Sequence, residues 1–285
     1  MDELWILTLY TNTLAFVVGA CVGSFLNVVI YRMPAGVSVV TPRSRCKCGA
    51  AIAWYDNIPI FSWFILRGKC RHCHASFSIR YSLIELGTAL LFLGLWNRGG
   101  WPDGIIWIIF TSMMIPAAFI DLDTMEIPDT FSIGGFITGL VLSAVVPSIH
   151  GVDLTGILFV DVTHGLVASL LGAFVGSGLI LWVALVAEAV LKKEAMGFGD
   201  VKLMGAIGAF CGWQGSIFAF FGGAVIGCLL LVVCWPWIRR KEEGEGTRIP
   251  FGPALAAGAV VYLLVARPYV AAYFANIEQV LGSFN

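Results

Sequence analysis

Charged residues are scarce in this chain of 285 residues. They make up 12% of the sequence, whereas soluble domains carry about 25%. Hydrophobic residues make up 59%, and apolar stretches of about 20 residues, enough to cross the hydrocarbon core of a bilayer, recur along the chain. This composition excludes a soluble globular domain. We therefore expect an integral membrane protein that has the lipid bilayer as a partner and does not bind nucleic acid.

The start of the chain lacks the basic residues that open a secretory signal peptide. It reads Met1-Asp2-Glu3, which is acidic, and the apolar stretch that follows is long enough to span a membrane. We expect no cleavable signal peptide, so this first stretch should remain as a membrane helix.

The apolar stretches predict an all-α polytopic membrane protein with about eight transmembrane helices and a small cytoplasmic zinc-knuckle-like insertion. The expected helices are Leu4–Ile30, Tyr81–Trp96, Ile105–Ile120, Phe131–Val146, Leu166–Leu191, Val201–Gly212, Ile217–Ile238 and Phe251–Ala266. The expected domains are a first transmembrane helix (1–30), a cytoplasmic Cys-rich domain (31–80), a transmembrane core (81–268) and a C-terminal tail (269–285). Tyr and Phe in the tail favour an interfacial helix.

The distribution of Lys and Arg orients these helices. Of the 17 cations, eight lie in the segment 31–80, and only Arg98 and Arg267 fall on the opposite side. The others on the first side are Lys192, Lys193, Lys202, Arg239, Arg240, Lys241 and Arg248. Because basic residues concentrate in cytoplasmic loops, we expect both termini outside, with the Cys-rich segment and two acidic loops in the cytoplasm.

Four cysteines cluster in the polar segment, as "CKC" and "CRHC": Cys46, Cys48, Cys70 and Cys73. The cytoplasm keeps thiols reduced, and two thiol pairs about 20 residues apart are typical of one structural zinc ion. The first pair is shorter than the usual C-x-x-C, so four unligated cysteines remain the alternative. His72 and His74 could replace one ligand. The other cysteines, in apolar stretches, should act as small hydrophobic residues.

The segment "GFGD" places Asp200 where a hydrophobic helix begins. A carboxylate there can cap the helix, which is the simplest interpretation. However, ionisable groups at membrane depth are often functional and usually have a partner. Gly197 and Gly199 would let an extended backbone approach Asp200 closely.

A second acidic segment, "IDLDTMEIPD", could supply the partner. Asp121 directly follows an apolar run, whereas Asp123 would point about 200° away from it on a helix, so only one of them faces a bundle interior. Asp129 is expected to cap the next helix. Two facing carboxyl groups would share one proton, and such a pair suits aspartic peptide hydrolysis without a metal or a covalent intermediate.

At this point the chain resembles a known family. "GFGDVKLMGAIG", "IDLDTMEIPD", "GSFLNVVIYRMP", "WYDNIPIFSW", "LRGKCRHC" and "IRYSLIEL" closely match bacterial prepilin peptidases, the type IV prepilin leader peptidase and N-methyltransferase family. The resemblance covers Phe16 to about Ala266. In the family patterns, the catalytic aspartates correspond to Asp121 and Asp200, which decides between Asp121 and Asp123. The family also carries a four-cysteine element, usually as two C-x-x-C pairs.

The resemblance implies a bifunctional enzyme of the bacterial inner membrane. It would cut the basic leader from prepilins or type II secretion pseudopilins, after a glycine and on the cytoplasmic side. It would then methylate the new N-terminal amine with S-adenosylmethionine. The alternatives are a peptidase that does not methylate, and a membrane transporter or scaffold without enzymatic activity.

No glycine-rich cofactor loop of the Rossmann kind is present, so the methyl donor would need an unusual site. The polar segment supports methyl transfer by resemblance, because shorter relatives lacking it do not methylate. The candidate residues are Asn27, Arg32, Trp54, Tyr55, Asp56, Asn57, Arg80, Tyr81 and Glu85. Glu85 lies within an expected helix and could instead pair with Arg80 or Lys202.

Overall fold

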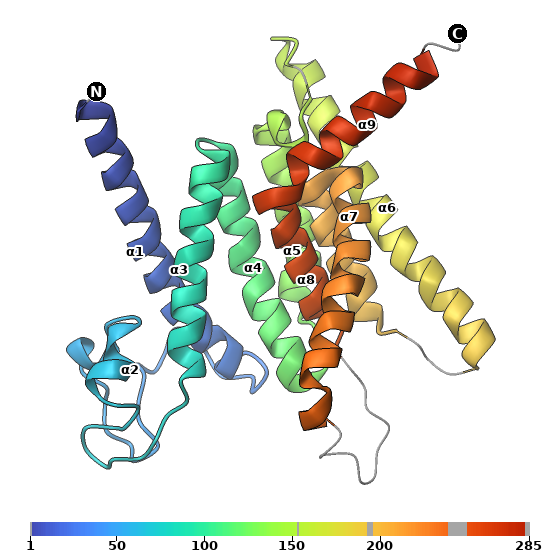
Figure 1. Ribbon diagram of the computed structural model, residues 1–285. Coiled ribbons are helices and arrows are strands. Elements are labelled where there is room, and N and C mark those ends of the chain that lie inside the picture. The colour runs from blue at the N-terminus through green and yellow to red at the C-terminus, as the bar shows by residue number, and fades with distance from the viewer. Residues whose placement is uncertain (1, 153, 193–195, 239–249, 283–285) are drawn as a thin grey trace. The chain divides into compact units, whose positions relative to one another are not determined.

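The computed structural model describes residues 2–152, 154–192, 196–238 and 250–282. The basic residues Lys193, Arg239, Arg240, Lys241 and Arg248, used above for orientation, lie outside these ranges. The chain divides into two compact units, Met1–Pro116 (unit 1) and Ala117–Asn285 (unit 2), and each is described by itself (Figure 1). Within the described residues the structure is helical, with two isolated β-bridges and no strand, so the all-α prediction is confirmed.

The helices follow the chain in a simple order. They are α1 (Asp2–Arg32), η1 (Trp54–Asn57), α2 (Phe61–Ile65), α3 (Arg80–Gly99), α4 (Asp103–Thr124), α5 (Asp129–Val145), η2 (Pro147–His150), α6 (Leu158–Leu191), α7 (Phe198–Ile238), α8 (Gly252–Val261), η3 (Tyr262–Ala266) and α9 (Arg267–Gly282). Five segments are long and apolar enough to cross a bilayer: Leu4–Arg32, Asp103–Thr124, Leu158–Leu191, Phe198–Val232 and Gly252–Ile277. The fourth segment belongs to α7, and this helix contains two of the expected spans. Two further expected spans correspond to α3 and α5, which are shorter or less apolar. The arrangement is therefore consistent with the expected eight.

In unit 1, α1 and α3 pack closely because α1 presents glycines to α3. A Cβ atom on Gly19 would lie 2.7 Å from the Cα of Ala89, and one on Gly23 would lie 2.8 Å from the Cα of Glu85. Small residues at this spacing let two membrane helices approach closely. Asn27 adds a polar contact, since its side-chain amide donates to the Tyr81 carbonyl at 3.0 Å.

Between α1 and α3, where the sequence predicted the Cys-rich segment, the chain is mostly irregular. It forms two tight loops, each closed by an isolated bridge, Arg45 with Ala51 and Lys69 with Ser76. Each loop carries one of the cysteine pairs. The short helices η1 and α2 lie between the two loops.

The helix α4 extends past its predicted end at Ile120 and ends at Thr124. The predicted end at Ile120 was therefore wrong by four residues, and Asp121 and Asp123 lie within the helix. Asp121 is buried and Asp123 is exposed, which agrees with the opposite directions expected on a helix.

The helix α5 begins at Asp129, two residues before its predicted start. The N-cap position is Pro128, which makes no side-chain cap, so the assignment of Asp129 as the cap was wrong. Asp129 instead forms an ion pair with Lys202 at 2.7 Å. Its carboxylate also lies in the first turn, where negative charge is favoured.

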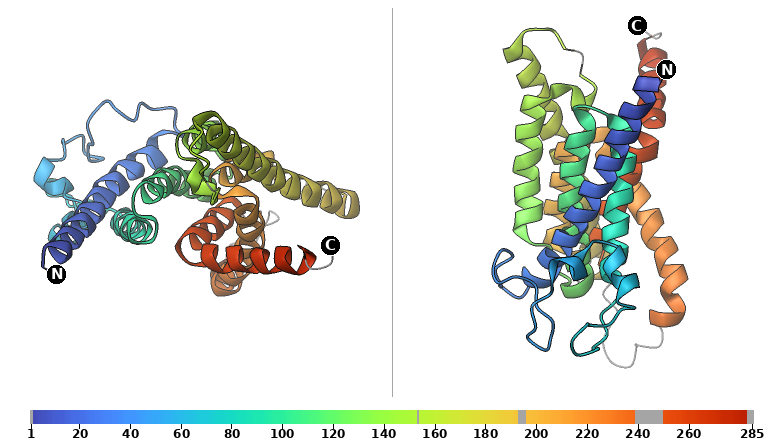
Figure 2. Two further views of the ribbon diagram at one scale, coloured as in Figure 1. Left: turned by 90° about the horizontal axis from the view of Figure 1, so that it is seen from above. Right: turned by 90° about the vertical axis from the view of Figure 1, so that its left-hand side faces the viewer.

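The helix α6 begins at Leu158, eight residues before the predicted start at Leu166. The reason is a local polar network. The buried Asp161 carboxylate accepts hydrogen bonds from the Thr155 N–H and hydroxyl and from the Gly156 N–H, at 2.7 to 3.2 Å. These hydrogen bonds stabilise the carboxylate, whose charge would otherwise be unfavourable within a membrane helix. Figure 2 shows the later half of α6 extending away from the other helices of unit 2.

The helix α7 joins the two predicted helices Val201–Gly212 and Ile217–Ile238 across a sharp break. Gly212 has φ 69° and ψ 179°, a backbone conformation that glycine adopts readily. The chain reverses there, so both ends of α7 lie at the same end of unit 2 (Figure 1). This places Asp200 at one end of the first arm, next to where α8 begins.

The two arms of α7 pack against α6 and α8 through glycines. A Cβ on Gly176 would lie 2.7 Å from the Met204 carbonyl oxygen, and one on Gly223 would lie 2.8 Å from that of Ala254. Gly172 and Gly208 are in direct backbone contact. Past α8, a π-helical turn leads into α9, so the expected interfacial tail is helical and continues the chain from α8.

Candidate active site and metal centre

Asp121 occupies the last turn of α4 and points into unit 2. Its side chain is only 5% exposed. The backbone N–H of Gly252, at the start of α8, donates to its Oδ2 at 3.1 Å. The end of α4 and the start of α8 are therefore joined at this carboxylate, although 131 residues separate them in the sequence.

Asp200 occupies the first turn of α7 and is 8% exposed. The helix begins two residues earlier, at Phe198, and the Asp200 N–H donates to the Gly197 carbonyl at 3.1 Å. Asp200 is thus inside the helix rather than at its N-cap, and the simple capping interpretation was wrong. A Cβ on Gly197 would lie 3.8 Å from the Asp200 Oδ2, so the carboxyl group turns back toward the glycine-rich entry.

Ile127 brings the surroundings of the two aspartates together. A Cβ on Gly252 would lie 3.0 Å from the Ile127 Cδ1, and one on Gly199 would lie 3.5 Å from the Ile127 Cβ. The Ile127 side chain therefore lies beside Gly252, which binds Asp121, and beside Gly199, which precedes Asp200. The two carboxyl groups lie close enough to interact electrostatically.

This arrangement supplies what acid–base chemistry needs. Two neighbouring buried carboxyl groups cannot both ionise easily, so a pair of this kind can share one proton. The ionised member can accept a proton while the neutral member donates one. Asp123 and Glu126, in the same acidic segment, are exposed, whereas the pair is buried.

An ion pair lies beside the aspartates. Lys202, two residues after Asp200, contacts Asp129 at the start of α5, and its Nζ lies 5.5 Å from the centre of the Phe198 ring. The pair joins the beginnings of α5 and α7 and is partly exposed, with 32% and 60% of the two side chains accessible. Lys202 is thus engaged with Asp129.

Sequence reasoning missed Gly252 and Ile127. The signal for Gly252 was available, since a glycine directly before a proline at a helix start offers free N–H groups to an anion. The signal for Ile127 was not, because an isoleucine in a short loop reveals its contacts only when the fold is known.

The four cysteines of unit 1 form the expected cluster. Their Sγ atoms all lie within 4.8 Å of one another, and those of Cys46 and Cys73 are 3.6 Å apart. Four sulfurs around a tetrahedral zinc ion, each at about 2.3 Å from the metal, are about 3.8 Å apart. The residues therefore fit a zinc ion, and the short C-x-C pair does not prevent it.

The second cysteine loop is held to η1 by a charged contact. Arg71 donates three hydrogen bonds to the Asp56 carboxylate at 2.6 to 3.1 Å, and its guanidinium lies 5.6 Å from the centre of the Tyr55 ring. These hydrogen bonds hold the pKa of Asp56 below its ordinary value. Asp56, one of the methyl-donor candidates, is thus occupied by a structural partner.

Glu85 also has a structural partner. It is half-buried on α3, and its Oε2 accepts the Ile60 N–H at 2.7 Å, where Ile60 has the left-handed φ of 69°. This contact fastens the loop between η1 and α2 to α3. Of the two ion-pair partners expected for Glu85, Lys202 pairs with Asp129 instead.

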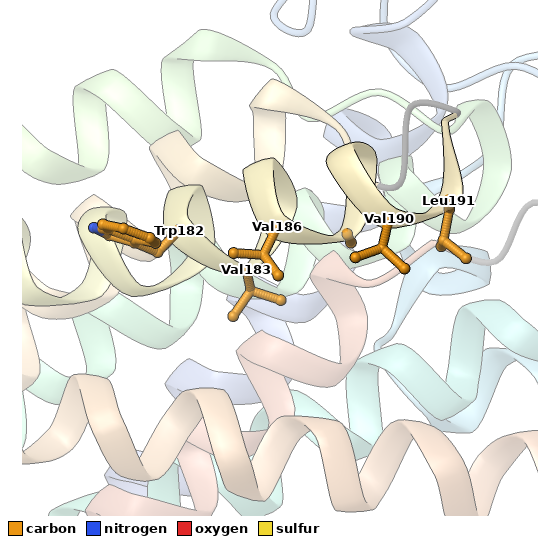
Figure 3. A pocket seen from close by; sticks show the side chains of 6 residues that line it. Trp182, Val183, Val186, Val190 and Leu191 are labelled. Atoms are coloured by element: carbon orange, nitrogen blue, oxygen red, sulfur yellow. The ribbon is translucent and has the colours of Figure 1, made fainter.

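An apolar hollow runs along the later half of α6 (Figure 3). It is lined by Trp182, Val183, Val186, Ala187, Val190 and Leu191. Within the described part of the chain, its lining offers no polar side chain that could orient a substrate, and its residues belong to one helix. An apolar face of this kind suits contact with lipid chains.

The family comparisons agree with the geometry. Residues 17–98 match the bacterial peptidase A24 N-terminal domain, and residues 108–232 match the type IV leader peptidase family. The second match contains both buried aspartates, and the first contains all four clustered cysteines. The comparison with solved structures finds no match.

Individual relatives cover most of the chain. A prepilin leader peptidase/N-methyltransferase of Myxococcus xanthus is 41% identical over 76% of this chain and 62% of its own length. A type 4 prepilin-like proteins leader peptide-processing enzyme of Escherichia coli is 35% identical over 88% of this chain and 93% of its own length. A prepilin leader peptidase/N-methyltransferase of Pseudomonas putida is 32% identical, with coverages of 90% and 91%.

The helical fold, the buried carboxyl pair and these matches define a class, the membrane peptidases. Within that class, the chain belongs to the type IV leader peptidase family. The family expected from the sequence motifs is therefore confirmed.

Proposed function

We propose that this protein removes the basic leader peptide of type IV prepilins or pseudopilins and methylates the new N-terminal residue. The observation that carries the first half is the pair of buried aspartates, Asp121 and Asp200, brought together around Ile127. The names of the Myxococcus xanthus and Pseudomonas putida relatives specify both leader cleavage and N-methyl transfer, and that of the Escherichia coli relative specifies leader processing.

In the proposed reaction the ionised aspartate takes a proton from water. The water oxygen bonds to the carbonyl carbon of the glycine before the cut, and the neutral aspartate gives its proton to the carbonyl oxygen. When the carbon–nitrogen bond breaks, the first aspartate returns its proton to the leaving amine. The second regains its own from the hydroxyl that reforms the carbonyl. Gly197 and Gly199 leave room for the substrate backbone beside Asp200.

The cut is proposed to lie on the cytoplasmic side of the bacterial inner membrane. Lys192 and Lys202 flank the entry to Asp200, and cytoplasmic loops are rich in such residues. The cysteine cluster, in a segment with eight cations and one acid, Asp56, belongs on the same side. There, thiols stay reduced and available for zinc.

Cys46, Cys48, Cys70 and Cys73 would hold the zinc ion, which would stabilise the two loops rather than act on substrate. S-adenosylmethionine is the proposed methyl donor and would supply the methyl group. The segment 31–80 is proposed as the region that supports methyl transfer, and residues 81–268 as the peptidase core.

The test is co-expression with a prepilin, followed by mass spectrometry of its N-terminus. Wild-type protein should yield a chain that has lost its leader and gained one methyl group, whereas Asp121→Asn and Asp200→Asn should leave the leader attached. Asp123→Asn, on the exposed face of the same helix, is the matched control and should process normally. Normal cleavage by both catalytic variants would contradict the proposal. Cleavage without methylation would support a peptidase alone.

A further inference from the structure

The contact between Gly252 and Asp121 depends on two separate features of residue 252, its N–H group and its lack of a side chain. The first provides the hydrogen bond, in which the Gly252 N–H donates to the Asp121 Oδ2 at 3.1 Å. Both residues are buried, so the contact lies away from bulk solvent. A hydrogen bond to a charged group in such a place is stronger than one between neutral groups.

The second feature is the absence of a side chain at residue 252. A Cβ there would lie 2.6 Å from the Asp121 Oδ2 and 3.0 Å from the Ile127 Cδ1. Its backbone does not have a positive φ, so glycine is needed for the close approach and not for an unusual conformation. Any other residue would push the carboxylate or Ile127 aside.

The start of α8 also favours negative charge on Asp121. Gly252 is the first residue of α8, and the first N–H groups of a helix have no partner within it. They form the positive end of the helix dipole, which stabilises a carboxylate. The segment Gly252–Val261 contributes no titratable side chain of its own.

Among the residues that the structure describes, the other charged groups near Asp121 do not supply this stabilisation. Asp200 is an acid that competes for the shared proton, and it lies in the first turn of α7, where the helix dipole favours its charge as well. The dipole alone therefore does not separate the two carboxyl groups, and the hydrogen bond from Gly252 does. Lys202, the cation of the same turn, is engaged with Asp129 of α5. Asp123, on the same helix as Asp121, is exposed on another face. The amide of Gly252 is thus the one hydrogen-bond donor to the Asp121 carboxylate among the described residues.

We propose that Gly252 is a positioning residue for leader cleavage, which makes Asp121 the ionised member of the pair. Asp121 takes the proton from water, and Asp200 holds the proton that passes to the substrate carbonyl oxygen. This inference rests on the proposed function, and it adds which carboxyl group performs which step and why residue 252 has no side chain.

The test compares Gly252→Ala with Gly258→Ala, a matched change on the same helix. A Cβ on Gly258 would also collide with backbone, at 2.6 Å from the Ala219 carbonyl oxygen, but it does not touch either aspartate. Each purified full-length variant is assayed for thermal unfolding and for cleavage of a prepilin peptide between pH 5 and 9. Rates are expressed per folded enzyme.

Gly252→Ala should lower kcat about tenfold to hundredfold with little change in KM, because a hydrogen bond to a charged catalytic group is lost or misplaced. It should also move the acidic limb of the pH–rate profile to higher pH, since the ionised form of the pair is less stabilised. Gly258→Ala should lower the unfolding temperature and leave kcat per folded enzyme and the profile unchanged.

The inference is overturned if Gly252→Ala matches Gly258→Ala in kcat and in pH profile. If Gly252→Ala does not fold, Asp121→Glu keeps the amide and the charge but moves the carboxylate away from the N–H. It should show the same shift of the acidic limb, and an unshifted limb overturns the inference. Normal cleavage by Asp121→Asn and Asp200→Asn would instead show that the proposed function itself is wrong.

Discussion

Unit 1 carries its four candidate ligand thiols on two partly exposed loops, whereas unit 2 carries its two carboxyl groups on helix ends in the interior. The thiols come from one short segment, residues 46–73, and their loops have almost no apolar core. The carboxyl groups come from helices whose contacts join residues 121, 200 and 252. A metal ion can stabilise the first kind of site, but only helix packing can build the second.

The largest expected effect is that of Asp121→Asn, which should separate leader cleavage from methyl transfer. Asp121→Asn should reduce leader cleavage at least about a thousandfold, because it removes the acid–base group of the pair. Methyl transfer to a pilin peptide that already lacks its leader should stay within about twofold of wild type, because that peptide no longer needs the bond hydrolysis that the aspartate pair performs. A purified-enzyme assay with both substrates checks this. Loss of both activities in a folded variant would break the comparison.

Removal of zinc should affect mainly unit 1, which carries the cysteine cluster. Cys46→Ser with Cys73→Ser should abolish the zinc content of the purified protein, measured by elemental mass spectrometry, because two of four ligands are lost. Methyl transfer should fall more than cleavage. A matched change at Cys228, an exposed cysteine outside the cluster, should leave the metal in place. Zinc retained without the cluster would contradict the assignment.

Helix packing in unit 2 should tolerate little added volume. Gly172→Ala should destabilise the protein by about 1–3 kcal/mol, since its Cβ would collide with the backbone at Gly208. Gly178→Ala, on the same helix but with open space around it, should have almost no effect. Thermal unfolding in detergent compares the two. Equal midpoints would show that the close contact of α6 with α7 does not support this unit.

The ion pair beside the aspartates should matter least. Lys202→Ala should lower the free energy of unfolding by less than about 1 kcal/mol, because the ion pair with Asp129 is partly exposed and water screens it. The loss should shrink further at high salt, and Asp129→Asn should behave alike. Thermal unfolding and cleavage rates, each at two salt concentrations, provide the measurement. A loss comparable to that of Asp121→Asn would mean that Lys202 takes part in the chemistry.

Local features of the molecule were predictable from the sequence, and contacts between distant segments were not. The end of the first arm of α7 at Gly212 and the cysteine cluster followed from local patterns. The start of α6 is an exception among local features: it was misplaced because Asp161 argued against a membrane helix, although Thr155, six residues earlier, binds its carboxylate. The glycine before a proline could mark Gly252 as a donor to an anion, but that the anion is Asp121 depends on a contact across 131 residues, which no periodicity encodes.

The catalytic pair shows the same division. Burial of one acid from "IDLD" followed from helix geometry, but only the family resemblance identified Asp121 rather than Asp123. The fold then supplied a physical difference between them, because Asp121 is buried against α8 and Asp123 is exposed.

The central claim is that the carboxyl groups of Asp121 and Asp200 meet. The direct measurement is cross-linking in membranes of a variant with Asp121→Cys and Asp200→Cys by a short bifunctional thiol reagent, read by mass spectrometry of the digested protein. The matched control replaces Asp123 instead of Asp121. The account predicts abundant linkage of the 121 and 200 peptides and little linkage in the control. Equal linkage in both, or linkage only from residue 123, would contradict it.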